Sequence, residues 1–189
     1  MGRLADPPRT LDGRARPEPR RYPEPMSGPL VPPGALVLLI GPAGIGKSTW
    51  AARHHRPTEV LSSDAFRAMV SDDPADQAAN GDAFRSLHGV ARARLKRGLT
   101  TVVDATNLTD GARQPLLALA TRFGRPVVAV VFDGPVEVAL ARNTARADRV
   151  VPDAVVRHHH AQLPAAVAAL RRAGVPIVTV ETGTAETPD

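Results

Sequence analysis

The sequence predicts an α/β fold in which a parallel sheet of about five strands is covered by helices on both faces. First, short apolar segments alternate along the chain with longer segments of helical periodicity. Second, Leu36–Ile40 is an unbroken apolar run, as expected of a strand that is buried on both faces of a sheet. Third, a glycine-rich loop follows this run and leads directly into a helical segment.

The remaining elements follow in chain order. The helix after the glycine-rich loop ends before Pro57, because proline cannot continue a helix. Apolar runs predict four further strands at residues 59–62, 99–103, 127–132 and 175–180. Helical spacing of apolar residues predicts helices at residues 82–97, 113–123, 135–147 and 152–173. Gly98 and Gly124 follow the first two of these helices, as expected of C-terminal stop signals.

Composition divides the chain into three parts. Residues 1–33 are rich in proline and arginine and show no apolar periodicity, which predicts a disordered arm. Residues 34–182 contain all of the alternating elements and predict a single folded domain. Residues 183–189 follow the last strand and predict a short flexible tail.

The composition also limits where the protein works and what it meets. The chain has no cysteine, so it forms no disulfides and uses no thiol chemistry. No apolar run is long enough to cross a bilayer or to act as a secretory signal, so we expect a cytoplasmic protein with no membrane partner. The formal net charge of +5 favours polyanionic partners, nucleic acid included.

Residues 41–48 form the motif that carries the most chemical information. They match G-x-x-x-x-G-K-[ST] without a mismatch, directly after a strand and before a helix. In this position backbone N–H groups surround nucleotide phosphates, Lys47 reaches the β- and γ-phosphates, and Ser48 ligates Mg²⁺. We therefore expect ATP, or another nucleoside triphosphate, together with Mg²⁺. The predicted nucleotide-binding residues are Gly41, Pro42, Ala43, Gly44, Ile45, Gly46, Lys47, Ser48 and Thr49.

Polar residues that follow the second and third strands are further candidates, because ligands bind beyond the carboxyl ends of parallel strands. Asp64 could accept a proton from an incoming hydroxyl group, while Arg67 on the same helical face could hold a phosphate of the acceptor. Asp104 ends the third strand and could support Mg²⁺. The alternatives are that Asp64 caps a helix and forms a surface ion pair with Arg67, and that Asp104 is another cap.

Arg142, Arg146 and Arg149 lie on one side of a predicted helix or of its end. Phosphoryl transfer needs positive charge on the transferring group, and an arginine-bearing lid often supplies it. We therefore predict that these arginines bind the nucleotide; the alternative is a solvated basic helix face. The histidines at 158–160, and those at 54–55, are interpreted as a solvated face, because adjacent helical positions point in different directions and cannot share a metal ion.

An ordered set of short motifs extends along residues 37–180. They are 61–64 with Arg67, 70–73 with Asp76 and Gln77, 83–84 with Leu87 and His88, 101–107, 112–113 with Pro115 and Leu116, 131–132, and Arg142 and Asn143 with Arg146. With these motifs the chain resembles the 5′-OH polynucleotide kinase family, and most closely the kinase module of bacterial RNA end-healing and repair enzymes.

The resemblance implies that residues 34–182 form a P-loop kinase domain, which transfers the γ-phosphate of ATP to 5′-hydroxyl ends of RNA or DNA. By the resemblance, Asp64 is the general base and Arg67 binds the phosphate of the acceptor. The residues that would act on the transferring phosphate are Lys47, Arg142 and Arg146, with Arg149 in the same lid and Ser48 and Asp104 at Mg²⁺.

Two other functions remain open at the level of the sequence. A P-loop kinase of this size could instead phosphorylate a small molecule such as a nucleoside, a sugar or an antibiotic. A non-enzymatic switch driven by a nucleoside triphosphate is the second alternative, although the chain has no Asn-Lys-x-Asp element for guanine recognition. The sequence indicates nothing about the oligomeric state.

Overall fold

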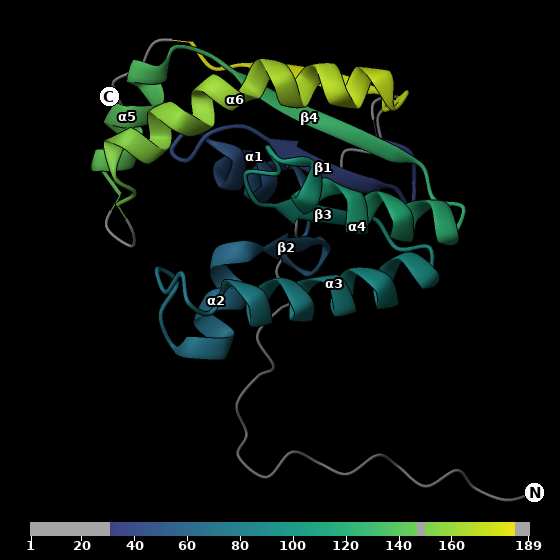
Figure 1. Ribbon diagram of the computed structural model, residues 1–189. Helices are drawn as coiled ribbons and strands as arrows, with labels where there is room; N and C mark the ends of the chain where they lie inside the picture. The colour runs from purple at the N-terminus through teal and green to yellow at the C-terminus, as the bar shows by residue number, and fades with distance from the viewer. Residues whose placement is uncertain (1–30, 147–149, 184–189) are drawn as a thin grey trace, which may run out of the picture.

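The computed structural model describes residues 31–146 and 150–183. At its centre lies a five-stranded parallel sheet with the strand order β2-β3-β1-β4-β5 (Figure 1). The strands are β1 (Leu36–Ile40), β2 (Val60–Ser62), β3 (Thr101–Asp104), β4 (Val127–Asp133) and β5 (Ile177–Glu181). The predicted parallel sheet is therefore confirmed, and the structure adds the order of its strands.

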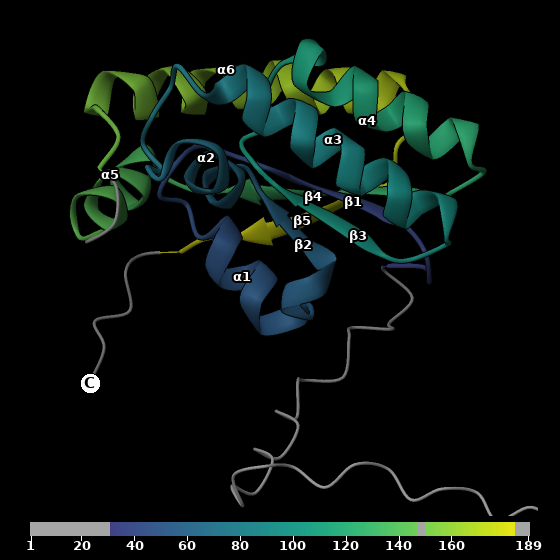
Figure 2. The same cartoon turned by 90° about the horizontal axis from the view of Figure 1, so that it is seen from below.

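Helices cover both faces of the sheet, as predicted. Figure 2 shows α3, α4 and α6 over one face and α1 against the other. The helices are α1 (Lys47–His54), α2 (Ser63–Ser71), α3 (Asn80–Lys96), α4 (Asp110–Arg122), α5 (Val136–Thr144) and α6 (Asp153–Arg172). In the described part of the chain, no helix combines the length and the apolar character needed to cross a membrane.

Local hydrogen bonds explain where element boundaries differ from the predicted ones. A 3-10 turn at Pro57–Glu59 precedes β2, so Glu59 belongs to this turn and the strand is shorter than predicted. The helix predicted from residue 113 begins at Asp110, because the Thr109 hydroxyl accepts a hydrogen bond from the Ala112 N–H at 3.3 Å and caps it.

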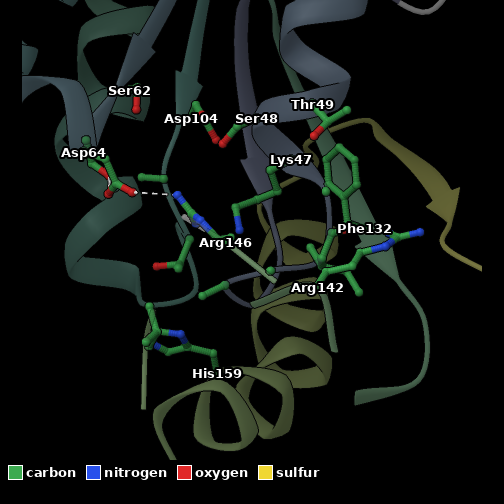
Figure 3. A pocket seen from close by; sticks show the side chains of 18 of the residues that line it. Lys47, Ser48, Thr49, Ser62, Asp64, Asp104, Phe132, Arg142, Arg146 and His159 are labelled. Carbon is green, nitrogen blue, oxygen red and sulfur yellow. Dashed lines mark hydrogen bonds and ion pairs between the residues drawn. The ribbon is translucent and has the colours of Figure 1, made fainter. Parts of the chain in front are cut away.

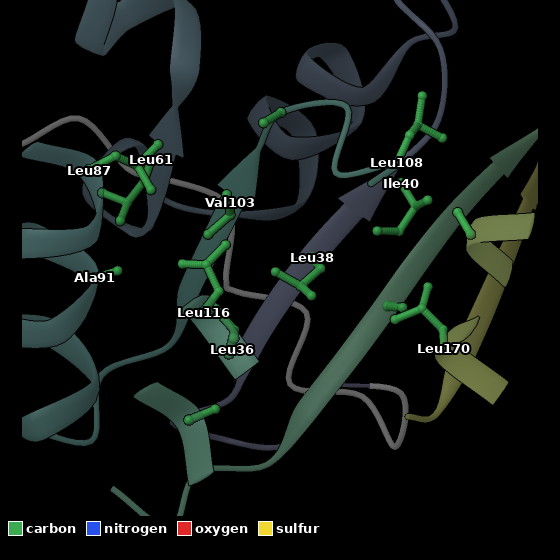
Figure 4. Close-up of a cluster of buried hydrophobic side chains, with 14 of the residues drawn as sticks. Leu36, Leu38, Ile40, Leu61, Leu87, Ala91, Val103, Leu108, Leu116 and Leu170 are labelled. Atoms are coloured by element: carbon green, nitrogen blue, oxygen red, sulfur yellow. The ribbon is translucent and has the colours of Figure 1, made fainter. Parts of the chain in front are cut away.

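The side chains of β1 alternate between two apolar clusters, one on each face of the sheet. Leu36, Leu38 and Ile40 pack with residues of α3, α4 and α6, including Leu87, Leu116 and Leu170 (Figure 4). The two remaining residues of β1, Val37 and Leu39, pack on the opposite face with Ala51 of α1 and with Ala139 of α5. All five residues of β1 are fully buried, so burial on both faces is confirmed.

The folded part of the chain begins earlier than the predicted boundary at residue 34. Val31 is only 6% exposed and packs in the same cluster as Val37. The predicted arm otherwise lies outside the described residues, because the description starts at residue 31. Most of the predicted tail, from residue 184 onward, also lies outside them.

Candidate active site

A cleft of about 1460 Å³ opens at the carboxyl ends of the strands. The strand order places β1 beside β3, and β3 beside β2, so the loops that follow these three strands lie side by side. Residues from these loops, from α5 and from the start of α6 line the cleft (Figure 3). The predicted site residues that it brings together are Lys47, Ser48, Asp64, Arg67, Asp104, Arg142 and Arg146.

The P-loop packs directly against α5. Gly44 has a φ of +81°, and a Cβ at this position would lie 2.2 Å from the backbone oxygen of Ala139. A side chain at residue 44 would therefore have to displace the helix. α1 begins at Lys47, so the N–H groups of its first turn point toward the bend of the P-loop, where phosphates bind in proteins that carry this motif.

Lys47 is held inside the P-loop by two hydrogen bonds. Its Nζ donates to the backbone oxygens of Gly41 at 2.9 Å and of Pro42 at 2.7 Å. Burial lowers the pKa of Lys47 to about 8, although the charges of Asp104 and Asp64 act to raise it. The ammonium group therefore lies in a poorly solvated position, where anionic phosphates would stabilise its charge.

Ser48 and Asp104 form an oxygen-rich pair beside Lys47. Asp104 is 6% exposed, and burial raises the pKa of its carboxyl group. A hydrogen bond with Ser48 and the charge of Lys47 act in the opposite direction. Thr109 caps the helix that follows, so Asp104 caps no helix there. A hydroxyl and a carboxylate are ligands that suit Mg²⁺, and this donor set fits the predicted metal site.

Asp64 lies in the first turn of α2, where Ser62 is the capping residue. One oxygen of Asp64, Oδ1, accepts a hydrogen bond from Arg67, and the other, Oδ2, lies 3.7 Å from Nη2 of Arg146 (Figure 3). Two guanidinium groups thus face this carboxylate inside the cleft. The alternative in which Asp64 caps the helix does not describe this geometry.

Arg67 is buried rather than part of a surface ion pair, since it is only 4% exposed. Its Nε donates to the backbone oxygen of Pro74 at 2.8 Å, and its Nη1 donates to Oδ1 of Asn80 at 2.9 Å. Arg67 therefore ties Asp64 to the segment after α2 and to the start of α3. Its predicted binding of an acceptor phosphate stays a prediction.

Two predicted lid arginines turn toward the cleft. Arg142, in the last turn of α5, donates from Nη1 to the backbone oxygen of Ile45 in the P-loop at 3.2 Å. Arg146 follows the helix and faces Asp64. This arrangement differs from the solvated basic face that was the alternative. Arg149 lies outside the described residues, so its predicted role stays a prediction.

The structure corrects two predictions made for histidines. His55 is 2% exposed and lies 3.4 Å from Glu59, so it is not part of a solvated face. His158 is exposed as predicted, but His159 lines the cleft and Nε2 of His160 lies 3.0 Å from the backbone oxygen of Gly134. No cluster of three or more potential metal ligands occurs among the described residues.

Sequence reasoning also gave no role to two residues that border the site. Phe84 belongs to one of the sequence motifs and lines the cleft from α3. Asn143 belongs to another motif and is fully buried near the end of α5. A single aromatic or amide residue within a helical pattern carries no signal of its own, so only their neighbours in space reveal these positions.

Comparison with known proteins supports this description of the fold. Residues 36–170 match the model of the AAA domain family. The adenylyl-sulfate kinase of Myxococcus xanthus, a curated relative, is 31% identical over 120 residues, a match that covers 58% of this chain. The chain spans 63% of the length of that relative.

Solved structures show the same arrangement of sheet and helices. A putative kinase from Chloroflexus aurantiacus has a TM-score of 0.58 at 20% identity, with 82% of this chain and 88% of that chain covered. A chain of the Pnkp1/Rnl/Hen1 complex has a TM-score of 0.50 at 25% identity, with 62% of this chain and 41% of that chain covered. The chain therefore belongs to the AAA domain family and has the fold of a P-loop kinase.

Proposed function

We propose that this protein is an ATP- and Mg²⁺-dependent kinase that transfers the γ-phosphoryl group of ATP to a hydroxyl group of a small molecule. The observation that carries the proposal is the position of Asp64. Its carboxylate enters the same cleft as Lys47 of the P-loop, close enough for its charge to raise the pKa of that lysine (Figure 3). A carboxylate beside the phosphate-binding loop provides a base for an acceptor hydroxyl.

The residues divide the reaction between them. The P-loop N–H groups, Lys47 and the arginines Arg142 and Arg146 bind the phosphates of ATP. Ser48 and Asp104 would hold Mg²⁺, which when bound would neutralise charge on the phosphate oxygens. The oxygen of the acceptor hydroxyl forms a bond to the γ-phosphorus while Asp64 accepts the proton of that hydroxyl. The bond from that phosphorus to the β–γ bridging oxygen breaks, and ADP leaves with the electron pair of this bond.

The lining of the acceptor side favours a small acceptor. Phe84, one helical turn after the Asn80 that binds Arg67, provides an apolar wall. Of the described basic residues that line the cleft, Lys47, Arg142 and Arg146 are assigned to ATP, which leaves Arg53, His54, Arg67 and His159, and Arg67 already pairs with Asp64. A polynucleotide end would bring several phosphates and would need more positive charge than this. The name of the adenylyl-sulfate kinase relative indicates a small acceptor for that protein.

Transfer to 5′-hydroxyl ends of RNA or DNA is the second candidate function. The net charge of +5 and the motifs from residue 61 to Arg146 favour it, because they resemble those of polynucleotide kinases. A chain of the Pnkp1/Rnl/Hen1 complex also shares the fold. Both candidates use the same donor site and the same base, and they differ only in the acceptor.

A panel of acceptors distinguishes the candidates. The protein is incubated with Mg²⁺, with ATP labelled at the γ-phosphate, and with adenylyl sulfate, nucleosides, sugars or 5′-hydroxyl oligonucleotides. We expect label in a small acceptor, and we expect Asp64→Asn to abolish transfer while ATP still binds. The control is Asp82→Asn. Asp82 is exposed and pairs with Arg85 three residues later, which is the same spacing as between Asp64 and Arg67.

Each outcome of the panel has a defined meaning. Label found only in oligonucleotides would replace the first candidate by the second. Release of inorganic phosphate without any labelled acceptor, at equal rates in wild type and Asp64→Asn, would exclude both kinases in favour of a nucleotide-driven switch.

A further inference from the structure

Asn143 closes the base of the segment that carries Arg146. Its side chain is fully buried in α5. The amide Nδ2 donates to the backbone oxygen of Val151 at 2.7 Å, and Oδ1 accepts from the backbone N–H of Val151 at 3.0 Å. The two contacts join α5 to Val151, which lies two residues before the first residue of α6, Asp153.

Asn143 also packs against the P-loop. A Cβ added to Gly44 would lie 3.0 Å from Cβ of Asn143 and 3.1 Å from its backbone nitrogen. The P-loop, α5 and Val151 therefore meet at one buried residue, Asn143. Arg142 and Arg146 leave the backbone one residue before and three residues after this point, so its position sets where both guanidinium groups enter the cleft.

We propose that Asn143 is a positioning residue that fixes Arg142 and Arg146 relative to the phosphate-binding loop. The role requires a side chain with one donor and one acceptor at the same end, because Val151 presents both a carbonyl and an N–H group. A side chain without this donor and acceptor would leave the carbonyl and N–H groups of Val151 without these hydrogen bonds, and the end of α5 would no longer be held at a fixed distance from Val151. This inference rests on the part of the proposed function in which the arginines bind phosphates.

The test measures the affinity for ATP in the presence of Mg²⁺ and without any acceptor, so it does not depend on identifying the acceptor. We expect Asn143→Ala to weaken ATP binding roughly tenfold, as expected when a charged hydrogen bond loses its geometry. Thr144→Val is the matched control, because it removes a hydrogen bond to Leu140 on the same helix without touching Val151. It should bind ATP as the wild type does.

A double-mutant cycle separates positioning from general stabilisation of the fold. If Asn143 acts through the arginines, Asn143→Ala should cause no further loss of affinity in a protein that already carries Arg142→Ala and Arg146→Ala. A purely structural residue would lower the melting temperature and leave the affinity of the folded fraction unchanged. Where Asn143→Ala does not fold, Asn143→Ser, which keeps one hydrogen-bonding group, takes its place in the cycle.

The outcomes are unambiguous. Equal ATP affinity of wild type and folded Asn143→Ala would overturn the proposal, as would a full additional tenfold loss in the arginine-free protein. If no acceptor in the panel is labelled, but Asn143→Ala weakens ATP binding only in the protein that retains Arg142 and Arg146, then the role of Asn143 stands and only the kinase activity is refuted.

Discussion

Lys47 shows how a single residue depends on its surroundings. The motif predicts that this lysine lies at the phosphates. Its pKa, however, depends on its burial, which the motif does not reveal. Burial outweighs the attraction of Asp104 and Asp64 and lowers the pKa of Lys47 to about 8. In the free protein this ammonium group, which we propose binds phosphate, therefore loses its charge as the pH rises past about 8.

The first prediction follows from the direction of this shift. In the proposed function the charged ammonium group binds phosphates, so we expect a bound nucleotide to raise the pKa of Lys47 above the value of about 8 in the free protein. The contribution of the lysine to ATP affinity is therefore fully present below pH 8 and is lost as pH rises above it. We expect the dissociation constant of ATP to increase by up to about tenfold per pH unit above this point.

Fluorescence or calorimetric titration at a series of pH values measures this dependence. The variant Lys47→Met should bind ATP weakly and show no such step, because it has no ammonium group to deprotonate. A wild-type affinity that stays constant well above pH 8 would contradict the prediction.

The other site residues differ in how far the sequence could identify them. Lys47 and Ser48 belong to a contiguous motif, and Asp64 and Asp104 follow predicted strands, so their position in the site could be predicted. The buried contacts of Arg67 with Pro74 and Asn80 could not, because they depend on how the segment after α2 folds back. Through these contacts Arg67 links Asp64 to the rest of the fold, while its binding of an acceptor phosphate stays a prediction.

At the level of elements, the contact between α5 and the P-loop organises the donor side. The helix comes so close that the backbone of Ala139 occupies the space where a side chain of residue 44 would stand. This contact links the phosphate-binding loop to the helix from which the lid arginines extend. The glycine at position 44 is therefore required by packing as well as by its positive φ.

The second prediction concerns Gly44→Ala. A left-handed backbone conformation costs an alanine roughly 1–2 kcal/mol, and the overlap with Ala139 adds to this, so we expect the free energy of unfolding to fall by at least that amount. Urea denaturation monitored by circular dichroism measures the change. We also expect weaker ATP binding by the folded protein, because α5 must move.

Gly89→Ala is the matched control for this prediction. Gly89 lies in α3 with no atom within 4 Å of an added Cβ. An alanine there should raise the free energy of unfolding by about 0.5–1 kcal/mol, because glycine is a poor helix former. Equal stability of the wild type and Gly44→Ala would show that α5 adjusts without cost.

Element positions could be predicted better than element ends. Apolar periodicity located every strand of the sheet, because a buried parallel strand needs a continuous apolar run. The ends were less predictable, since they depend on single hydrogen bonds such as the Thr109 cap of α4 and on the 3-10 turn at Pro57–Glu59.

On the scale of the whole molecule, the site exists because the sheet brings separate segments together. Asp104 at the end of β3 meets Ser48 at the start of α1 only because β3 pairs with β1. A bound metal ion and nucleotide would therefore join the sheet, α1 and the lid, and should stabilise the folded protein as a unit.

The third prediction uses this coupling. ATP with Mg²⁺ at a hundred times its dissociation constant should stabilise the fold by about 2.7 kcal/mol, seen as a rise in melting temperature. In Asp104→Asn we expect ATP alone to stabilise the protein as in the wild type, while the additional effect of Mg²⁺ is lost, because the amide is a weaker ligand. An undiminished effect of Mg²⁺ in this variant would exclude Asp104 from the metal site.

The sequence by itself determined the fold class, the phosphate-binding loop and the residues that follow each strand, because apolar periodicity and short contiguous motifs are local properties of the chain. Only the tertiary structure decided the strand order, the approach of Arg146 to Asp64, and the burial of Asn143 beside the P-loop. These features join residues far apart in the sequence, and their energies arise from packing and from removal of water, which no local pattern records.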